Sequence, residues 1–129
     1  MKSESASRKK TVVIVGASNK PDRASYQLLQ RMIRRGGYDP ILVHPVLKEI
    51  DGMPVLASLS EVPMNPDIVS LYVNAKASQA MEGELERLHP GKVIFNPGAE
   101  NYELLENLGR HEIDGEEACS LVLLSQNLL

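Results

Sequence analysis

The chain has 129 residues, of which 43% are hydrophobic, and a formal net charge of −3 at neutral pH. Its length predicts one folded domain, and the acidic balance excludes a nucleic-acid binder that works by general electrostatic attraction. We therefore expect no nucleic acid as a partner. No apolar stretch can span a bilayer, so we expect no membrane as a partner either. A polar N-terminus without a signal-peptide core and a single cysteine, Cys119, favour a reducing cytoplasm.

The domain is expected at residues 10–129, after a flexible tail at residues 1–9. It opens with the run 11–15, TVVIV, which is β-branched and shows no polar alternation. Such a run predicts a strand buried on both faces, as in a parallel sheet. A small-residue turn and a polar loop follow at residues 16–23, and the apolar spacing then predicts a helix over residues 24–35.

This succession of strand, turn and helix is typical of the first unit of a nucleotide-binding fold. Gly16 permits a tight turn, and the N–H groups and dipole at the helix start favour a bound phosphate. The three-glycine dinucleotide pattern is absent, because Ser18 and Pro21 stand where it requires glycine. A purely structural turn is the alternative; Ser18, Lys20 and Arg23 together favour a phosphate ligand.

A second strand is expected at residues 40–43, with His44 and Pro45 at its carboxyl end. NAD-binding units carry an acidic residue there for the ribose hydroxyls, and its absence disfavours NAD. His44 is open to two interpretations, a ligand contact or a strand-end histidine with a backbone partner. A short edge strand at residues 54–56 and one helical turn at residues 58–62 are expected next.

The rest of the chain continues the same alternation of strands and helices. The expected elements are a strand at 67–73, a helix at 78–88 capped by Ser78, a strand at 92–95, a helix at 101–108 ended by Gly109, a strand at 112–113 and a terminal helix within 118–129. This order predicts a doubly wound α/β fold: a single domain with a Rossmann-like parallel sheet in three layers and the first strand at its centre. Ligands bind such sheets at the carboxyl ends of the strands.

Taken together, these motifs resemble the small single-domain CoA-binding proteins, whose fold is similar to the CoA-binding domain of succinyl-CoA synthetase. The resemblance covers nearly all of residues 10–129. The segments on which the resemblance rests are the run VVIVGASNKPDRASYQLLQRMIRRGGY, the HP pair at 44–45, IDGMPVLASLSEVP at 50–63, FNPGAENYELLENLG at 95–109 and EEACSLVLLSQ at 116–126.

The resemblance implies a set of ligand contacts. Gly16, Ala17 and Ser18 would hold the CoA diphosphate, Lys20 and Arg23 would supply charge, and Pro21 would shape the loop. His44 and Pro45 would border the adenosine, in the place of the family's Asn-Pro pair. Val73 and Lys76, which leave the fourth strand, and Asn96, Pro97 and Gly98, which follow the next, would complete the site.

These observations favour a module that binds CoA or an acyl-CoA without catalysis of its own. One alternative is a nucleotide-sensing domain for NAD(H). Another is a small acyl-CoA enzyme that uses Cys119, although a cysteine in an apolar terminal segment is more often buried and inert. The sequence shows no zinc-type spacing of Cys and His, so no metal is expected. A homodimer is left open.

Overall fold

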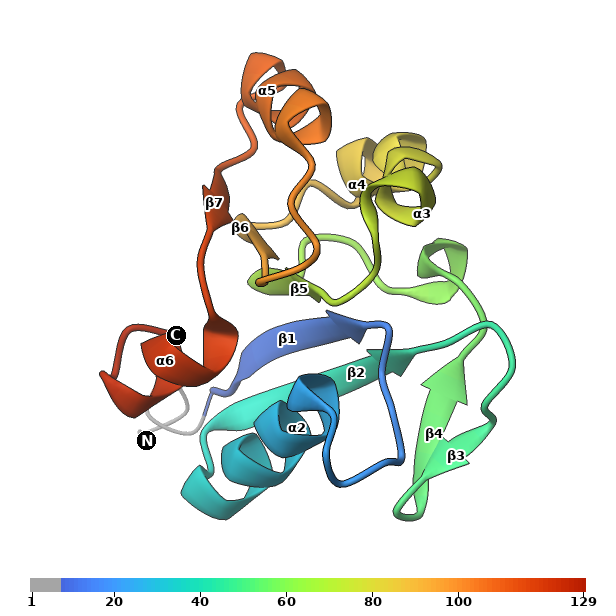
Figure 1. Ribbon diagram of the computed structural model, residues 1–129, viewed down its shortest axis with the longest axis vertical. Coiled ribbons are helices and arrows are strands. Elements are labelled where there is room, and N and C mark those ends of the chain that lie inside the picture. The colour runs from blue at the N-terminus through green and yellow to red at the C-terminus, as the bar shows by residue number, and fades with distance from the viewer. Residues whose placement is uncertain (1–7) are drawn as a thin grey trace.

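The computed structural model describes residues 8–129, and the expected tail lies almost wholly outside them. A seven-stranded sheet with the order β3-β4-β2-β1-β5-β6-β7 forms the middle layer (Figure 1). The strands are β1 (Lys10–Val15), β2 (Tyr38–Val43), β3 (Glu49–Ile50), β4 (Met53–Leu56), β5 (Ile68–Leu71), β6 (Lys92–Phe95) and β7 (Gly115–Glu117). All neighbours pair in parallel except β3 and β4. The predicted central position of the first strand is confirmed.

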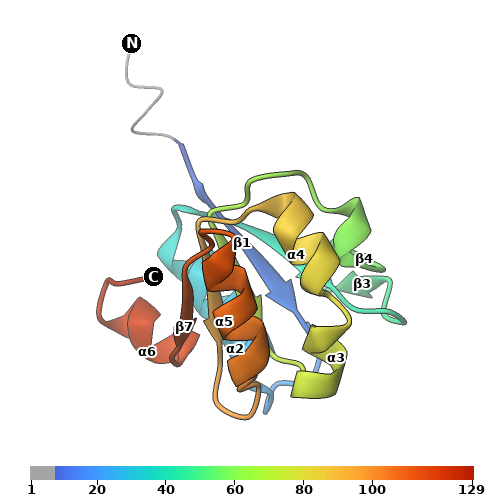
Figure 2. The same ribbon diagram turned by 90° about the horizontal axis from the view of Figure 1, so that it is seen from above.

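Helices cover both faces of this sheet. They are α2 (Ala24–Arg35), α3 (Ala75–Gln79), α4 (Glu82–Leu88), α5 (Tyr102–Arg110), α6 (Ser120–Ser125) and the short 3₁₀ helix η1 (Leu59–Glu61). Two views agree that α2 and α6 lie on one face and that α3, α4 and α5 lie on the other (Figures 1 and 2). The expected three-layer α/β fold is therefore confirmed. No helix in residues 8–129 has the length and apolar character needed to cross a membrane.

The core is divided into two halves by β1. Val12 and Ile14 pack with α2 and α6, whereas Val13 and Val15 pack with α4 and α5. All four side chains are at most 1% exposed. Each such burial stabilises the fold by about 1.5–3 kcal/mol relative to an exposed side chain. This strand, buried on both faces, is the one that the run of β-branched residues predicts.

Helix α2 begins and ends where the sequence predicts, and its chain reverses at Gly36, with φ of 78°. The apolar spacing of this helix predicts a buried side made of Tyr26, Leu28, Leu29, Met32 and Ile33. Leu28, Leu29 and Met32 are buried, but Ile33 is 51% exposed, so the burial predicted for it is wrong. A helix turns about 100° per residue, which places Ile33 at the margin of the apolar arc centred on Met32.

The expected helix at residues 78–88 is two helices, and its predicted cap is wrong. Asn74 caps α3, because its Oδ1 accepts a hydrogen bond from the Ala77 N–H at 2.9 Å, and Ser78 is buried within that helix. The chain leaves the helix at Met81, with φ of −96° and ψ of 0°, before α4 begins. Asparagine and serine both cap helices well, and here the helix begins after the earlier of the two, Asn74, rather than after Ser78.

The two strand assignments at the margins of the sheet also need correction. The strand after the Asp51 turn is not an edge, because the two-residue β3 pairs with it across a hairpin with φ of 51° at Asp51 and 82° at Gly52. Paired positive φ values are typical of a hairpin turn. The last strand lies at residues 115–117 rather than 112–113, since α5 continues through Gly109 to Arg110.

Gly91 provides a test of how closely the starts of β5 and β6 approach. A Cβ at Gly91 would lie 2.7 Å from the Asp67 carbonyl oxygen, whereas a Cβ at Gly83 in α4 would meet nothing within 4 Å. We expect Gly91→Ala to lower the free energy of unfolding by about 1–3 kcal/mol through this overlap. Gly83→Ala should raise it by about 0.5–1 kcal/mol, since alanine favours the helix. Urea denaturation of both variants measures the difference; equal stabilities would contradict it.

Candidate ligand-binding site

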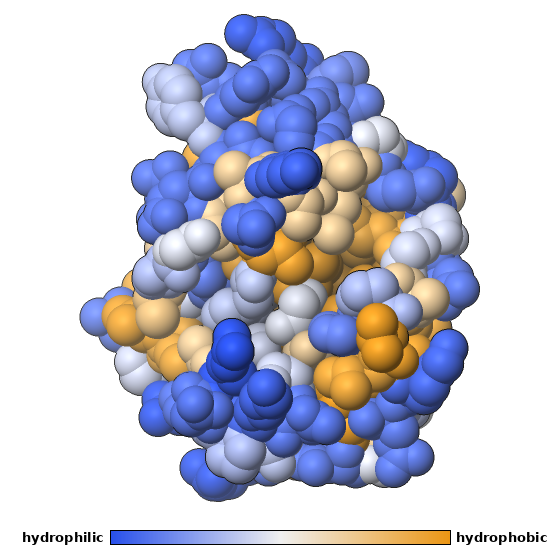
Figure 3. Space-filling view, turned by 45° about the vertical axis from the view of Figure 1, so that its right-hand side comes forward, coloured by the Kyte–Doolittle hydropathy of each residue, from blue (hydrophilic) through white to orange (hydrophobic). Residues whose placement is uncertain are grey.

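A cavity of about 810 Å³ opens at the carboxyl ends of β1, β2 and β4. Its volume falls in the range of small-molecule sites. Figure 3 shows a hollow in this side of the molecule, with apolar surface at its floor and a rim of both hydrophilic and apolar residues. The cavity is lined by Val15, Gly16, Ala17, Ser18, Asn19, Lys20, Arg23, Val43, His44, Pro45, Leu47, Ala57, Ser58, Leu59, Ser60, Val73, Ala80, Met81 and Glu84.

The structure brings most of the predicted contact residues together around this cavity. Those that line it are Gly16, Ala17, Ser18, Lys20, Arg23, His44, Pro45 and Val73. Those outside the lining are Pro21, Lys76, Asn96, Pro97 and Gly98. The first group follows three neighbouring strands, as the parallel sheet requires, and their contact with a ligand stays a prediction.

The turn after β1 is held between two neighbouring strands. The N–H groups of Gly16 and Ala17 both donate to the Val43 carbonyl oxygen, at 3.1 and 3.2 Å. Gly16 has φ of 87°, and a Cβ there would lie 3.0 Å from the Tyr72 carbonyl oxygen. Glycine is therefore required by the backbone conformation and by the closeness of β5. These two N–H groups are already bonded, so they are not free donors for a ligand.

Positive charge at this turn comes from Lys20 and Arg23, both exposed at the cavity. Arg23 is the N-cap residue of α2, and its side chain makes no capping hydrogen bond. The first turn of α2 has no acidic residue, and within residues 8–129 neither cation forms a salt bridge. A helix start without a cap, beside two unpaired cations, suits an anion.

Of the two interpretations of His44, the structure shows the backbone partners, and a ligand contact stays a prediction. Its Nδ1 accepts hydrogen bonds from the N–H groups of Val46 and Leu47, each at 3.0 Å. A neutral imidazole that accepts at Nδ1 carries its proton on Nε2, so the ring still offers one donor. An asparagine Oδ1 holds a turn by the same pattern of bonds. The histidine thus closes the loop after β2 and also lines the cavity.

The opposite wall of the cavity was not predicted. It comes from residues 57–60, after β4, and residues 80–84, between α3 and α4. Glu84 belongs to a run of acidic residues, Glu82, Glu84 and Glu86, that is typical of a solvated surface, but Glu84 lines the cavity. To predict this wall, one would have to infer that β4 pairs in parallel with β2, because this pairing brings the exit loops of both strands to the same edge.

Asn96 lies below this edge and serves the fold. It is 1% exposed, and its Nδ2 donates to the Leu71 carbonyl oxygen at 2.8 Å and to Ser70 Oγ at 2.9 Å. Its Oδ1 accepts the Ser120 N–H at 2.8 Å, at the start of α6. Both amide hydrogens are engaged, so the side chain has no donor left for a ligand.

The other predicted residues outside the cavity are exposed. Lys76 lies on α3, and Pro21 follows Lys20 in the first loop. Pro97 and Gly98 follow β6, where the Gly98 N–H donates to both Glu100 carboxylate oxygens at 3.1 Å. Bonds from the backbone N–H groups of Glu100 and Gly98 lower the pKa of the Glu100 carboxyl.

Two further reactive groups lie outside the cavity lining. Cys119 is half-buried just before α6 and is a free cysteine. Tyr72 packs nearby, and its hydroxyl is buried without a hydrogen-bond partner among the described residues. Burial raises the pKa of the Tyr72 phenol to about 12, although the hydroxyls of Ser70 and Ser120 act in the opposite direction. Among the described residues, no group of three His, Cys, Asp or Glu is placed to hold a metal ion.

Comparison with known proteins gives a family match and several similar structures. A family model described as "CoA binding domain" matches residues 10–125. The uncharacterized protein YneT of Bacillus subtilis is 30% identical over 108 residues, which cover 80% of this chain and 78% of that protein. A crystal structure of an uncharacterized protein matches with a TM-score of 0.86 and 31% identity, and covers 94% of this chain and 98% of that one.

A larger protein shares the fold alone. An acetyl-coenzyme A synthetase of Ca. Korarchaeum cryptofilum, solved with phosphate and ADP, matches with a TM-score of 0.62 and 22% identity. The match covers 84% of this chain but 24% of the synthetase chain. It shows that the same arrangement of strands and helices occurs as one part of a longer enzyme.

The turn held by His44 leads to a test of its backbone role. His44→Ala removes the acceptor for the Val46 and Leu47 N–H groups, and we expect the free energy of unfolding to fall by about 1 kcal/mol. His44→Asn replaces the Nδ1 acceptor by Oδ1 and should stay within about 0.5 kcal/mol of the parent chain. Chemical denaturation distinguishes the two; an equal loss in both variants would contradict the shared capping role.

The unpaired Tyr72 hydroxyl leads to a second prediction. The phenol of an unfolded chain loses its proton near pH 10, whereas burial keeps Tyr72 protonated to about pH 12. The folded state therefore retains a proton that the unfolded state loses, and its stability falls by up to about 3 kcal/mol between these pH values.

Tyr72→Phe should abolish this part of the fall in stability and, at pH 7, raise the free energy of unfolding by up to about 1 kcal/mol, because no hydrogen bond is lost. Denaturation of both proteins at pH 8 and pH 11 measures the effect. A variant less stable than the parent at pH 7 would show that the hydroxyl has a partner.

Proposed function

The chain belongs to the CoA binding domain family, and from this we propose that it binds CoA or an acyl-CoA in the cavity at the carboxyl edge of its sheet. The observation that carries the proposal is the pair of unpaired cations, Lys20 and Arg23, beside the uncapped start of α2. CoA has a diphosphate and a further phosphate on its ribose, so it suits a cationic loop. The Korarchaeum synthetase, solved with phosphate and ADP, gives support at the level of the fold.

We place the diphosphate at the loop 16–23. Ser18, Lys20 and Arg23 supply its polar and charged contacts, while Gly16 and Ala17 shape the turn through their bonds to β2. The adenosine then lies on the β2 side, next to His44 and Pro45. This end of β2 has no carboxylate, which a ribose-binding NAD site requires.

The pantetheine arm would leave the cavity beyond Val73. Lys76, Pro97 and Gly98 are exposed outside the lining, so they are proposed contacts only for an arm that extends over the exits of β5 and β6. All hydrogen-bonding groups of the Asn96 amide bond other parts of the chain, so we propose that Asn96 holds the segments after β5 and β6 in place and does not contact the ligand.

We propose a binding role without catalysis by this chain. The cavity lining contains the hydroxyls of Ser18, Ser58 and Ser60 and the imidazole of His44, and among the described residues no hydrogen bond joins any of these hydroxyls to His44. Cys119, the candidate thiol of an acyl-CoA enzyme, lies outside the lining. The lone cysteine suits the reducing cytoplasm, where the CoA thiol also stays free.

Calorimetric titration with CoA, acetyl-CoA and NAD tests this function. CoA species should bind more tightly than NAD, and Arg23→Ala should weaken CoA binding about tenfold to a hundredfold, the effect of losing a charge-assisted hydrogen bond. Arg31→Ala is the matched control, because Arg31 is exposed on the same helix but outside this cavity. Absence of CoA binding, or tighter binding of NAD, would refute the proposal.

A further inference from the structure

Glu84 is the acidic side chain in the lining of a cavity whose other charged residues, Lys20 and Arg23, are cations. These cations come from the loop before α2, whereas Glu84 comes from α4 on the other face of the sheet (Figure 1). The carboxylate and the two cations therefore enter the cavity from different elements. A carboxylate beside a polyanion would be repelled, so it needs a ligand group of its own.

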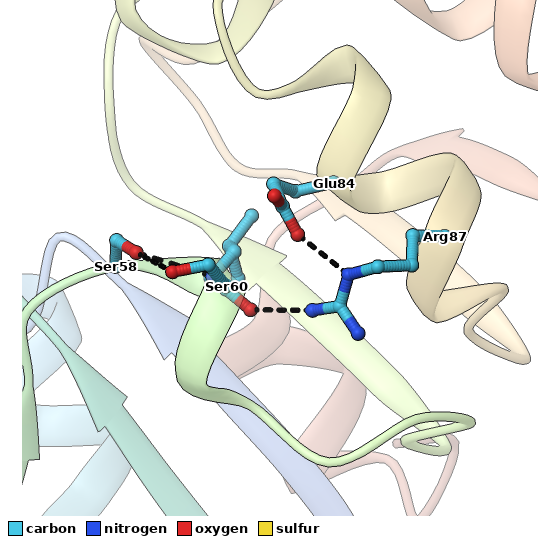
Figure 4. A network of polar contacts seen from close by, with 5 residues as sticks. Ser58, Ser60, Glu84 and Arg87 are labelled. Atoms are coloured by element: carbon cyan, nitrogen blue, oxygen red, sulfur yellow. Dashed lines mark hydrogen bonds and ion pairs between the residues drawn. The ribbon is translucent and has the colours of Figure 1, made fainter.

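A network of polar contacts fixes the Glu84 carboxylate (Figure 4). Arg87 Nε donates to Glu84 Oε1 at 2.7 Å, and Arg87 Nη2 donates to the Leu59 carbonyl oxygen at 3.0 Å. The guanidinium thus joins α4 to η1 and partly neutralises the acid. Within the described part of the chain, Oε2 of Glu84 has no hydrogen-bond partner, so one acceptor remains for a ligand.

The surroundings of Glu84 suit a planar base. Met81 supplies apolar surface in the same wall beside the largely buried Leu59, and the hydroxyls of Ser58 and Ser60 bond to each other at 2.5 Å. Small-molecule sites combine such apolar surface with a few placed polar groups. With the diphosphate at the loop before α2 and the ribose beside β2, the base of the nucleotide reaches this wall.

We propose that Glu84 recognises the 6-amino group of adenine and thereby restricts the cavity to adenine nucleotides. The inference rests on the proposed function. An ionised carboxylate only accepts hydrogen bonds, and the 6-amino group is a donor. Guanine and hypoxanthine carry a carbonyl oxygen at that position, which would place two acceptors against each other. Arg87 acts as a positioning residue, because it holds the carboxylate without needing to touch the ligand.

Displacement of CoA by ADP and by inosine diphosphate tests the proposal. The two competitors share ribose and phosphates, and inosine diphosphate has an oxygen in place of the 6-amino group. The parent chain should bind ADP at least about tenfold more tightly, as expected for one hydrogen bond to a charged group.

Glu84→Gln keeps the acceptor for Arg87 and adds an amide donor that can pair with the inosine oxygen. The preference for ADP should then fall to about twofold or less. Glu86→Gln is the control on the same helix: Glu86 pairs with His111 at 3.2 Å and lies outside the cavity lining, so the preference should not change. Melting temperatures of all three proteins report any structural effect separately.

An unchanged ADP preference in Glu84→Gln, with CoA still bound, would overturn this inference and leave the proposed function standing. So would a parent chain that binds ADP and inosine diphosphate equally. A parent chain that binds no CoA would overturn the proposed function and the inference together. A lower melting temperature in Glu84→Gln with an unchanged preference would show that Glu84 only orients Arg87, which joins α4 to η1.

Discussion

The parallel pairing of β1 with both β2 and β5 is the constraint on which the rest of the structure depends. Parallel strands have their carboxyl ends at the same edge, so the turns that follow them must meet there. Helices must then cross both faces, which buries residues 12–15 of β1 and divides the core into two halves. The cavity lies among the turns that meet at this edge. Fold and site therefore have the same cause.

The turn after β1 shows how tightly this edge is built. The Val43 carbonyl oxygen accepts both N–H groups of Gly16 and Ala17, and the Tyr72 backbone leaves no room for a side chain at Gly16. This contact between three strands fixes where the polar loop begins. The free polar groups of the loop are consequently displaced toward Ser18 and α2, away from the strand. The small residues of this turn are therefore needed for packing between the strands, and the groups available to a ligand lie in the loop that follows.

Local signals predicted the elements with the strongest patterns. The bounds of α2 and of β6 follow directly from apolar spacing and from flanking glycines, and both agree with the structure. The sequence missed β3, which exists only through its pairing with β4 across a tight hairpin, and it misplaced the start of the next helix, because α3 begins at Ala75 with Asn74 as its cap. Short-range patterns cannot rank such competing interactions.

The candidate site also has a part that local sequence patterns predict and a part that they do not. The loop 16–23 and His44 could be identified because each follows a strongly patterned strand. The wall that contains Glu84 could not, since it is assembled by the pairing of β4 with β2 and by the break between α3 and α4. Asn96 shows the reverse case: an Asn-Pro-Gly run after a strand indicates a ligand loop, but its amide bonds groups 24 to 26 residues away.

The two parts of the cavity, the loop 16–23 and the wall that contains Glu84, carry opposite charges. Lys20 and Arg23 reach it from the loop before α2, and Glu84 reaches it from α4 with one oxygen held by Arg87. An apolar wall with Leu59 and Met81 adjoins the carboxylate. Free anions such as phosphate would use the cationic loop alone and leave that wall uncovered. The arrangement is complementary to a molecule with an anionic middle and a flat, donor-bearing end. In the complex that we propose, the wall assembled by tertiary structure would discriminate among nucleotides, and the loop 16–23 would attract their phosphates.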